Sequence, residues 1–236
     1  MDTGHTSGNL LLDSMDQDER ERLLKGSELE EMAVRRVLIQ PGKPIDRVFF
    51  PISGLVSLVT PMLDGGAFEM ATVGREGVVG VPAALIHEGS SHVKGIARVS
   101  GQVISVDGDH LRNELERSPG LAGRVNEFLD ALFTLAGQDA ACHRLHNNEQ
   151  RCARWLLMTH DRVGLDQFPL SYEFLSQMVG TIRESVTEAV GGLQDLGAIR
   201  YSRGQATIKD RKSLQNHACE CYEVVAKAFE SLYAPV

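Results

Sequence analysis

The stretch that decides the fold is Leu170–Gly204, LSYEFLSQMVGTIRESVTEAVGGLQDLGAIRYSRG. Ser171 is placed to cap a short helix, and Gly180 supplies a turn at its end. Thr181 and Glu184, three residues apart, fit a capping box that opens a second helix. Two short helices that meet at a glycine predict a helix-turn-helix, in which the second helix packs against the first.

The second helix of this pair is expected to bury one face and expose the other. Its apolar stripe consists of Ile182, Val186, Ala189, Val190 and Leu193. The opposite face, near the N-terminal end, carries four candidate DNA base readers, which are Arg183, Glu184, Thr187 and Glu188. Arginine can contact guanine with two hydrogen bonds, and a carboxylate can accept one from cytosine. An ordinary helical hairpin with a charged outer face is the alternative interpretation.

Two short strands follow the second helix and predict a wing. They are Ala198–Ser202 and Gln205–Ile208, joined by Arg203 and Gly204. Side chains of this region and of the helix starts would contact phosphates and position the protein without reading sequence. These candidate phosphate contacts are Ser171, Thr181, Arg200, Arg203 and Lys209. A basic run by itself is also typical of a solvated surface.

The first half of the chain predicts a small β-sandwich or barrel. Short apolar runs are broken by Gly, Pro and Asp, and the clearest are Val48–Phe50, Leu55–Thr60, Phe68–Val73 and Gln102–Val106. Asp64, Gly65 and Gly66 supply the backbone freedom of a hairpin turn between two of these strands. The expected fold class is α+β, with an N-terminal, jelly-roll-like β-roll.

A long helix is expected to begin at Pro119, capped by Ser118. Its apolar residues recur at alternating spacings of four and three, the pattern of a coiled coil. They are Leu121, Val125, Phe128, Leu132 and Leu135. We expect them to form the seam of a dimer, and a helix packed on its own domain is the alternative. Asn147 and Asn148 interrupt this helix before a second one over Glu149–Arg162.

These elements divide the chain into four expected parts. They are a helical or flexible N-terminal segment (1–33), a β-roll sensor domain (34–117), a dimerisation helix (118–146) and a winged helix-turn-helix domain with a C-terminal helix (147–236). The formal net charge of −8 argues against a protein that coats nucleic acid nonspecifically. No run approaches the roughly 20 apolar residues of a membrane helix, and no signal peptide is recognisable, so we expect a cytoplasmic protein.

Three stretches of the chain resemble the Crp/Fnr family of transcription regulators. Leu170–Gly204 looks like the DNA-binding domain of that family, especially in LSQMVG, RESVT and LQDLGAI. Phe49–Gly80, FFPISGLVSLVTPMLDGGAFEMATVGREGVVG, resembles its cyclic-nucleotide-binding-like β-roll. Glu149–Arg162 resembles the helix that follows the dimerisation helix. The resemblance covers about Arg35–Tyr222, nearly the whole chain.

This resemblance implies a homodimer that binds a two-fold symmetric operator, with the paired second helices in successive major grooves. It implies base contacts for Arg183 and Glu184. Many relatives have an arginine four residues after that glutamate, where this chain has Glu188. The expected partners are double-stranded DNA and a second copy of the chain, and RNA polymerase is a further candidate.

Cyclic AMP is not an expected ligand. Members of the family that bind cyclic nucleotides carry a Gly-Glu for the ribose, whereas the matching place here reads Gly80-Val81-Pro82. Downstream, Ser91–Arg98 offers Lys94 but no Arg-Ser or Arg-Thr pair for the cyclic phosphate. Polar ligand atoms against an apolar wall would each lose about 1 to 3 kcal/mol.

No metal or cluster is predicted either. An iron-sulfur cluster needs several closely placed thiolates, and the first cysteine is Cys142. Cys142 and His146, four residues apart, would supply only two metal ligands per chain, or four across a dimer. Cys219 and Cys221 are expected on different faces of a C-terminal helix from about Leu214, where redox sensing is a further hypothesis.

Two alternatives come from other classes of protein. A cupin-like ligand- or metal-binding β-roll without DNA binding needs clustered histidines, whereas His87, His92 and His110 are isolated in sequence. The other is a sensor that binds a protein through its β-roll and uses the C-terminal module only to dimerise. No catalytic constellation stands out, so the chain is not expected to be an enzyme.

Overall fold

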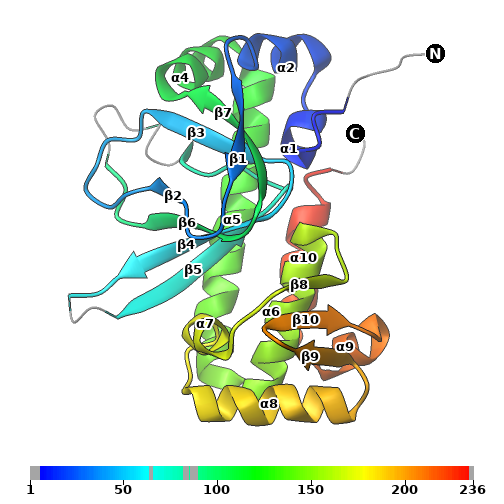
Figure 1. The fold of residues 1–236 in the computed structure, drawn as a ribbon. Coiled ribbons are helices and arrows are strands. Elements are labelled where there is room, and N and C mark those ends of the chain that lie inside the picture. Colours follow the sequence, from blue (N-terminus) through cyan, green and yellow to red (C-terminus); the bar gives the residue numbers. More distant parts are fainter. Residues whose placement is uncertain (1–5, 64–65, 82–84, 86–89, 234–236) are drawn as a thin grey trace.

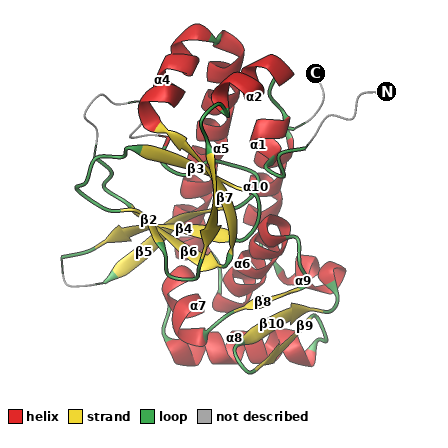
Figure 2. Cartoon of the chain, turned by 45° about the horizontal axis from the view of Figure 1, so that its top comes forward, coloured by secondary structure: helices red, strands yellow, loops and turns green. Residues whose placement is uncertain are grey.

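A long central helix connects two units in the structure (Figure 1), a computed structural model that describes residues 6–63, 66–81, 85 and 90–233. This helix, α5 (Pro119–Leu145), passes behind the β-roll and ends at the winged helix-turn-helix unit. Figure 2 shows the strands of the β-roll on one side of α5 and a small three-stranded sheet at the other end of the molecule. The expected α+β class is confirmed.

The β-roll consists of two antiparallel sheets. One sheet has the order β1 (Glu28–Met32), β7 (Gly101–Asp107) and β3 (Arg47–Pro51). The other has the order β2 (Val37–Ile39), β6 (Lys94–Val99), β4 (Leu55–Pro61) and β5 (Ala67–Val73). The four strands expected from sequence are confirmed. Alternate residues of β6 are buried, as a strand with one face on a core requires.

The β-roll begins earlier than the sequence suggested. Strand β1 pairs with β7 in the register Glu28 to Ser105, so the roll starts at Glu28 rather than Val34. Only Met32 of this strand is buried, so its apolar signal is too weak to be recognised in the sequence. The expected hairpin turn lies partly outside the described residues, at Asp64 and Gly65.

In the described part of the chain, three helices flank the roll before α5. They are α1 (Leu10–Asp13), α2 (Gln17–Leu23) and α4 (Gly108–Arg117). Asn9 ties α1 to the roll, since its side-chain amide donates to the carbonyl oxygens of Pro51 at 2.8 Å and Gly77 at 2.9 Å. Asn9 therefore holds α1 against the β-roll.

Helix α5 begins as the sequence predicted, but its apolar stripe faces inward. Ser118 accepts a hydrogen bond from the Leu121 amide, and Pro119 is the first helical residue. The five expected seam residues, Leu121, Val125, Phe128, Leu132 and Leu135, are each at most 8% exposed in the single chain. They pack within the protomer, where α5 contacts β5, α4 and α10. The interpretation of this stripe as a dimer seam is wrong, and the alternative of packing on its own domain holds.

The C-terminal part contains more helices than expected. Asn147 caps α6 (Asn148–Val163) through a capping box with Gln150, which confirms the interruption at the asparagines. The expected C-terminal helix is broken into α9 (Arg211–His217) and α10 (Cys221–Glu230). Helix α10 runs back along α5, where the rings of Phe128 and Phe229 meet edge to face at 6.3 Å.

Two buried ionisable groups of the β-roll contact α6. Glu76 forms an ion pair with Arg162, whose Nε lies 2.9 Å from the carboxylate, and both side chains are at most 8% exposed. Glu69 accepts a hydrogen bond from the Trp155 indole at 3.1 Å. Burial raises the pKa of Glu69 to about 7. The β-roll and the C-terminal unit therefore share a polar, buried interface.

Within the described residues, no helix combines the length and apolar character that a membrane span needs.

Candidate nucleic-acid interface

The helix-turn-helix consists of α7 (Tyr172–Met178) and α8 (Arg183–Asp195). Ser171 caps α7 as predicted, because its hydroxyl accepts from the Phe174 amide at 3.1 Å. Gly180 makes the turn with a φ of +61°, and a Cβ at this position would lie 2.6 Å from the His143 ring. Only glycine suits both the backbone angle and this close approach.

The predicted capping box of the second helix is absent. Ile182, not Thr181, is the N-cap residue of α8, and no side chain caps this end. Ile182 is also 65% exposed, so it is not part of the buried stripe. The rest of the stripe is buried as expected and consists of Val186, Ala189, Val190 and Leu193. The first turn of α8 thus leaves its backbone amides without a side-chain partner at an exposed helix end.

All four candidate base readers are exposed at the start of α8. They are Arg183, Glu184, Thr187 and Glu188. The Thr187 hydroxyl donates to the Arg183 carbonyl oxygen at 3.0 Å, so its acceptor sites face outward. Within the described part of the chain, Arg183, Glu184 and Glu188 have no ion-pair partner in the protein. Their hydrogen-bonding groups are available to a ligand.

The wing is confirmed as β9 (Ile199–Ser202) and β10 (Gln205–Ile208), with β8 (Gln167–Pro169) at the far side of β10. Arg203 and Gly204 have φ values of +49° and +73°. Two successive positive φ angles define the hairpin turn whose twist matches its strands. Tyr201 fixes the wing on the helix-turn-helix, because its ring stacks on Tyr172 at 4.4 Å and its hydroxyl donates to the Leu170 carbonyl.

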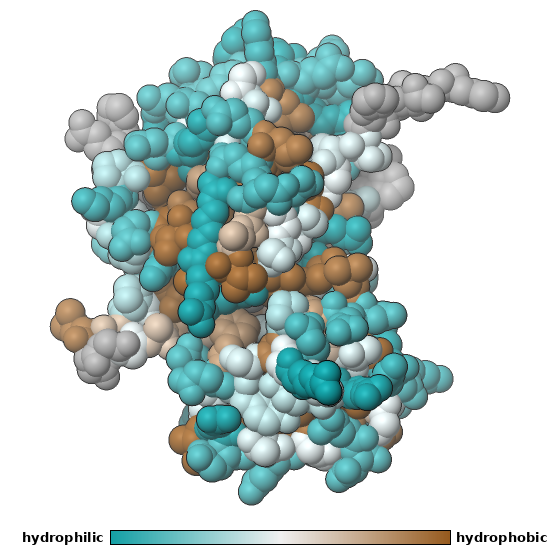
Figure 3. Space-filling view, in the orientation of Figure 1, coloured by the Kyte–Doolittle hydropathy of each residue, from teal (hydrophilic) through white to brown (hydrophobic). Residues whose placement is uncertain are grey.

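The three wing cations lie together on the surface. Arg200, Arg203 and Lys209 are exposed and line one hollow of about 330 Å³. In Figure 3 the surface over β9 and β10 is strongly hydrophilic. Ser171 is exposed and Thr181 is partly exposed. The structure therefore brings the predicted phosphate contacts to the same end of the molecule as the start of α8.

Arg211, a cation that follows the wing in sequence, is not available to DNA. Arg211 donates to Asp161 at 2.6 Å and to the Tyr222 hydroxyl at 2.6 Å, and its other Nη lies 2.6 Å from the His160 ring. It connects α9 to α6 and α10 instead. Nothing in the sequence around Arg211 distinguishes it from the free cations, because its partners lie 11 to 51 residues away.

Helix α5 presents a second stripe of residues, which the sequence analysis did not predict. Its members are partly or fully exposed and follow spacings of three and four: Gly123, Asn126, Asp130, Phe133, Gly137, Ala140 and Arg144. We call this set the outer stripe. Phe133 is 79% exposed at its centre, and a Cβ on Gly123 or Gly137 would meet nothing within 4 Å. The spacings of three and four residues can be seen in the sequence here too. This stripe contains only one large apolar residue, Phe133, so the more apolar stripe with Phe128 gave the stronger signal.

The expected effector region of the β-roll is partly described. Val81 is fully buried, whereas Pro82 and His87 lie outside the described residues. The guanidinium of Arg98 lies 4.5 Å from the centroid of the Phe174 ring of α7, and its Nε contacts the Ser57 hydroxyl of β4. His110 contacts the backbone carbonyl of Arg22 at 3.0 Å, so no histidine cluster of the cupin type forms in the described part of the roll.

Comparison with protein families gives two matches. The cyclic nucleotide-binding domain matches residues 30–118, and the Crp-like helix-turn-helix domain matches residues 150–217. The first covers the β-roll and the second covers α6, the helix-turn-helix, the wing and α9.

Curated relatives and solved structures agree with these matches. The chain is 22% identical over 190 residues to the global nitrogen regulator of Synechococcus elongatus, covering 77% of this chain and 85% of that protein. It is 23% identical over 184 residues to the CRP-like cAMP-activated global transcriptional regulator of Mycobacterium tuberculosis, covering 75% and 82%.

Among solved structures, FixK2 from Bradyrhizobium japonicum has a TM-score of 0.69 at 18% identity, covering 82% of this chain and 98% of that one. A CRP-family transcriptional regulator from Thermus thermophilus has a TM-score of 0.66 at 20% identity, covering 80% and 96%. Both family matches occur in one chain in the order of a β-roll, a long helix and a winged helix-turn-helix. The chain therefore belongs to the Crp/Fnr family of DNA-binding transcription regulators.

Proposed function

We propose that this regulator binds a two-fold symmetric operator as a homodimer, reads bases with the first turns of α8, and does so without cyclic AMP. In such a complex the two α8 helices enter successive major grooves, roughly 34 Å apart. The wing of each protomer then lies on the neighbouring phosphates.

One observation carries the base-reading part of this proposal. Arg183 and Glu184 are exposed beside each other at the start of α8, and neither is paired within the described residues. An unpaired guanidinium can form the two parallel hydrogen bonds that distinguish guanine. The exposed wing cations Arg200, Arg203 and Lys209 lie on the adjoining hairpin and supply charge that holds the DNA backbone regardless of sequence.

The outer stripe of α5 supports the dimer. Phe133 exposes 79% of its surface, although a phenylalanine gains about 1.5 to 3 kcal/mol from burial. Gly137 and Ala140, which follow at the next two positions of the stripe, carry little side chain and permit a second helix to approach closely. A parallel or antiparallel copy of α5 on this stripe would bury Phe133 twice, once from each protomer.

Independence from cyclic AMP rests on the β-roll. The place where relatives present an acid to the ribose holds Val81, which is fully buried. Arg98, the arginine at the end of the Ser91–Arg98 segment, is engaged with Phe174 and contacts the Ser57 hydroxyl at 3.4 Å. Neither group offers the ribose or the cyclic phosphate a partner.

The decisive experiment first selects operator DNA from a random pool with the full chain. It then compares the affinities of the wild type, Arg183→Lys and Lys25→Ala for the selected DNA. Arg183→Lys keeps the charge but loses the two-pronged geometry, so we expect about a ten- to hundredfold loss of affinity for the selected site. Lys25→Ala removes an exposed charge at the far end of the molecule and serves as the control. Binding to unrelated DNA should be the same for all three. Equal selectivity of Arg183→Lys and the wild type would refute base reading by this residue.

A further inference from the structure

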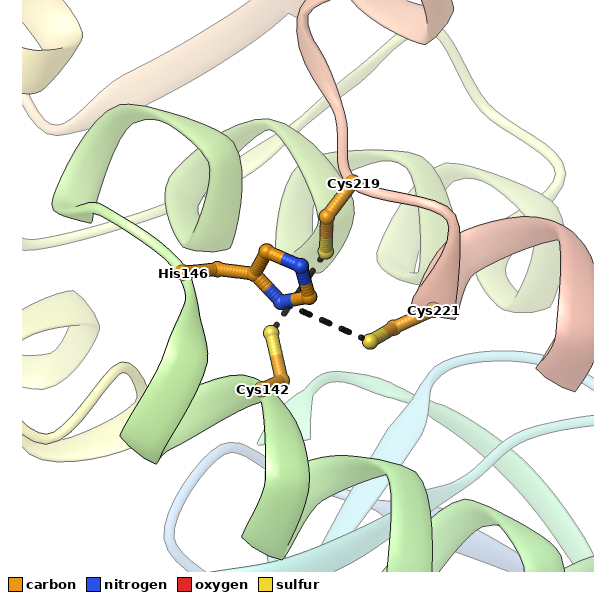
Figure 4. A group of neighbouring side chains, drawn as sticks. All are labelled: Cys142, His146, Cys219 and Cys221. Atoms are coloured by element: carbon orange, nitrogen blue, oxygen red, sulfur yellow. Dashed lines mark hydrogen bonds between the residues drawn. The ribbon is translucent and has the colours of Figure 1, made fainter.

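Three cysteines and one histidine of the same chain converge between α5 and the start of α10. Figure 4 shows Cys142 in the last turn of α5, His146 at the end of that helix, and Cys219 and Cys221 on the segment that enters α10, all four pointing toward one another. One ligand atom from each residue lies within 4.8 Å of the other three. Three of the residues are buried, and His146 is partly buried.

The break between α9 and α10 makes this convergence possible. Cys142 lies in the last turn of α5, and His146 is the C-cap residue, whose backbone N–H donates to the Cys142 carbonyl oxygen. The sequence predicted a continuous C-terminal helix with Cys219 and Cys221 on different faces. Instead α9 ends at His217, Cys219 lies in the connection, and Cys221 is the first residue of α10. Both thiols therefore face the end of α5.

The spacing of the donor atoms matches a tetrahedral metal site. The Sγ atoms of Cys142 and Cys219 are 3.5 Å apart, and Sγ of Cys221 lies 3.6 Å from Nδ1 of His146. Zinc bonds of about 2.3 Å to sulfur and about 2.0 Å to nitrogen place tetrahedral neighbours roughly 3.8 Å apart for two sulfurs and roughly 3.5 Å apart for sulfur and nitrogen. All pairs of donor atoms lie within 4.8 Å, so side-chain movements of about 1 Å would bring the four atoms to one ion.

The surroundings of the cluster suit a metal with thiolate ligands. Nε2 of His146 lies 3.2 Å from the Glu220 carboxylate, an arrangement that leaves Nδ1 free for a metal. Metal-bound histidines typically donate their other ring N–H to such a carboxylate. Arg154, 5% exposed, interacts electrostatically with Cys142, Cys219 and Cys221. Arg154 also forms an ion pair with Asp139, so its charge is shared between that carboxylate and the thiolate cluster.

We propose that Cys142, His146, Cys219 and Cys221 bind one zinc ion within each protomer. A set of three thiolates and one imidazole in tetrahedral arrangement selects zinc among the common divalent metals. All four positions are filled by protein, so the site is structural rather than catalytic. It connects the end of α5 to the start of α10, and thereby holds the C-terminal helix and the winged unit in a defined orientation on the long helix. The sequence analysis predicted that the chain binds no metal.

The test measures metal in the full chain purified without chelator. Inductively coupled plasma mass spectrometry should find close to one zinc ion per protomer. Cobalt added to the chelator-treated protein should give the visible bands of a tetrahedral ion and the near-ultraviolet absorption of cobalt-bound thiolate. Cys219→Ser should lose both signals, whereas Cys152→Ser, which removes a buried cysteine of α6 outside the cluster, should keep them.

Two controls keep the proposal open to refutation. A disulfide between Cys142 and Cys219 is the competing use of these thiols, and it would leave two reactive thiols in the unfolded wild type instead of four. If Cys219→Ser does not fold, His146→Ala and the cobalt titration of the wild type decide in its place. A wild type that binds neither metal near one equivalent, or that binds cobalt without thiolate absorption, overturns the proposal.

Discussion

Glu69 makes the stability of this protein depend on pH in an unusual direction. Its carboxyl group is buried between β5 and α6, where one oxygen accepts from the Trp155 indole at 3.1 Å and the other has no hydrogen-bond partner within the described residues. Burial raises its pKa from the usual 4.5 to about 7, against the opposing effect of Ser57, Trp155 and Arg98. Over that range the folded protein keeps a proton that the unfolded chain has released.

The size of the effect follows from the two pKa values. Each pH unit between them is worth about 1.36 kcal/mol, so the full cost of ionising Glu69 is on the order of 3 kcal/mol. Because the folded state binds more protons, its free energy of unfolding falls as pH rises from 4.5 to 7. Above pH 7 Glu69 is ionised in both states and no longer makes stability depend on pH. Between pH 5 and pH 8 the wild type should therefore lose roughly 2 to 3 kcal/mol relative to Glu69→Gln.

Denaturant unfolding of both proteins at a series of pH values measures this difference. Glutamine keeps an acceptor for the Trp155 indole but cannot ionise, so Glu69→Gln should overtake the wild type in stability as the pH approaches 8. Glu116→Gln, which alters an exposed carboxylate of α4, should follow the wild-type pH profile. Parallel profiles for the wild type and Glu69→Gln would show that Glu69 is ionised in the folded protein throughout this range, and would refute the reasoning.

Three further outcomes follow from the proposed function. Lys209→Ala should weaken binding to all DNA sequences about equally. It should also reduce the slope of log affinity against log salt by about 2 per dimer, because each protomer loses one phosphate contact. Lys25→Ala should leave the slope unchanged. Phe133→Arg should weaken the dimer by roughly 3 kcal/mol or more, at least a hundredfold in dissociation constant, as measured by sedimentation equilibrium. Leu29→Arg, at a side chain 62% exposed on β1, is its control, and an unchanged dimer would exclude the outer stripe as the interface. Calorimetry with cyclic AMP should give no binding heat. A dissociation constant in the micromolar range would contradict the proposal that Val81 deprives the ribose of its partner.

The helix-turn-helix and its wing could be predicted because their signals are local. Ser171 caps α7, Gly180 turns with positive φ, and Arg203 and Gly204 form the hairpin turn, each through atoms a few residues away. The strands of the β-roll were recognised for the same reason, since alternation of apolar residues is written in consecutive positions. Strand β1 was missed because it buries only one side chain fully.

Other features depend on which elements the tertiary structure brings together. Helix α5 has two stripes with the same spacing, and only its packing on β5 and α10 decides that the one with Phe128 is inside and the one with Phe133 is outside. The sequence likewise contains Cys142 and Cys219, but they are 77 residues apart and meet only because α10 folds back along α5.

The amino-acid sequence by itself thus determined the DNA-binding module, the β-roll and their order, because short-range geometry and hydrophobic periodicity specify those elements. Only the tertiary structure decided which face of α5 is exposed. It also decided that Arg211 binds Asp161, His160 and Tyr222 within the protein, and that three thiols and an imidazole lie in one site. The physical reason is that burial and proximity between distant residues are properties of the packed chain, which no local pattern encodes.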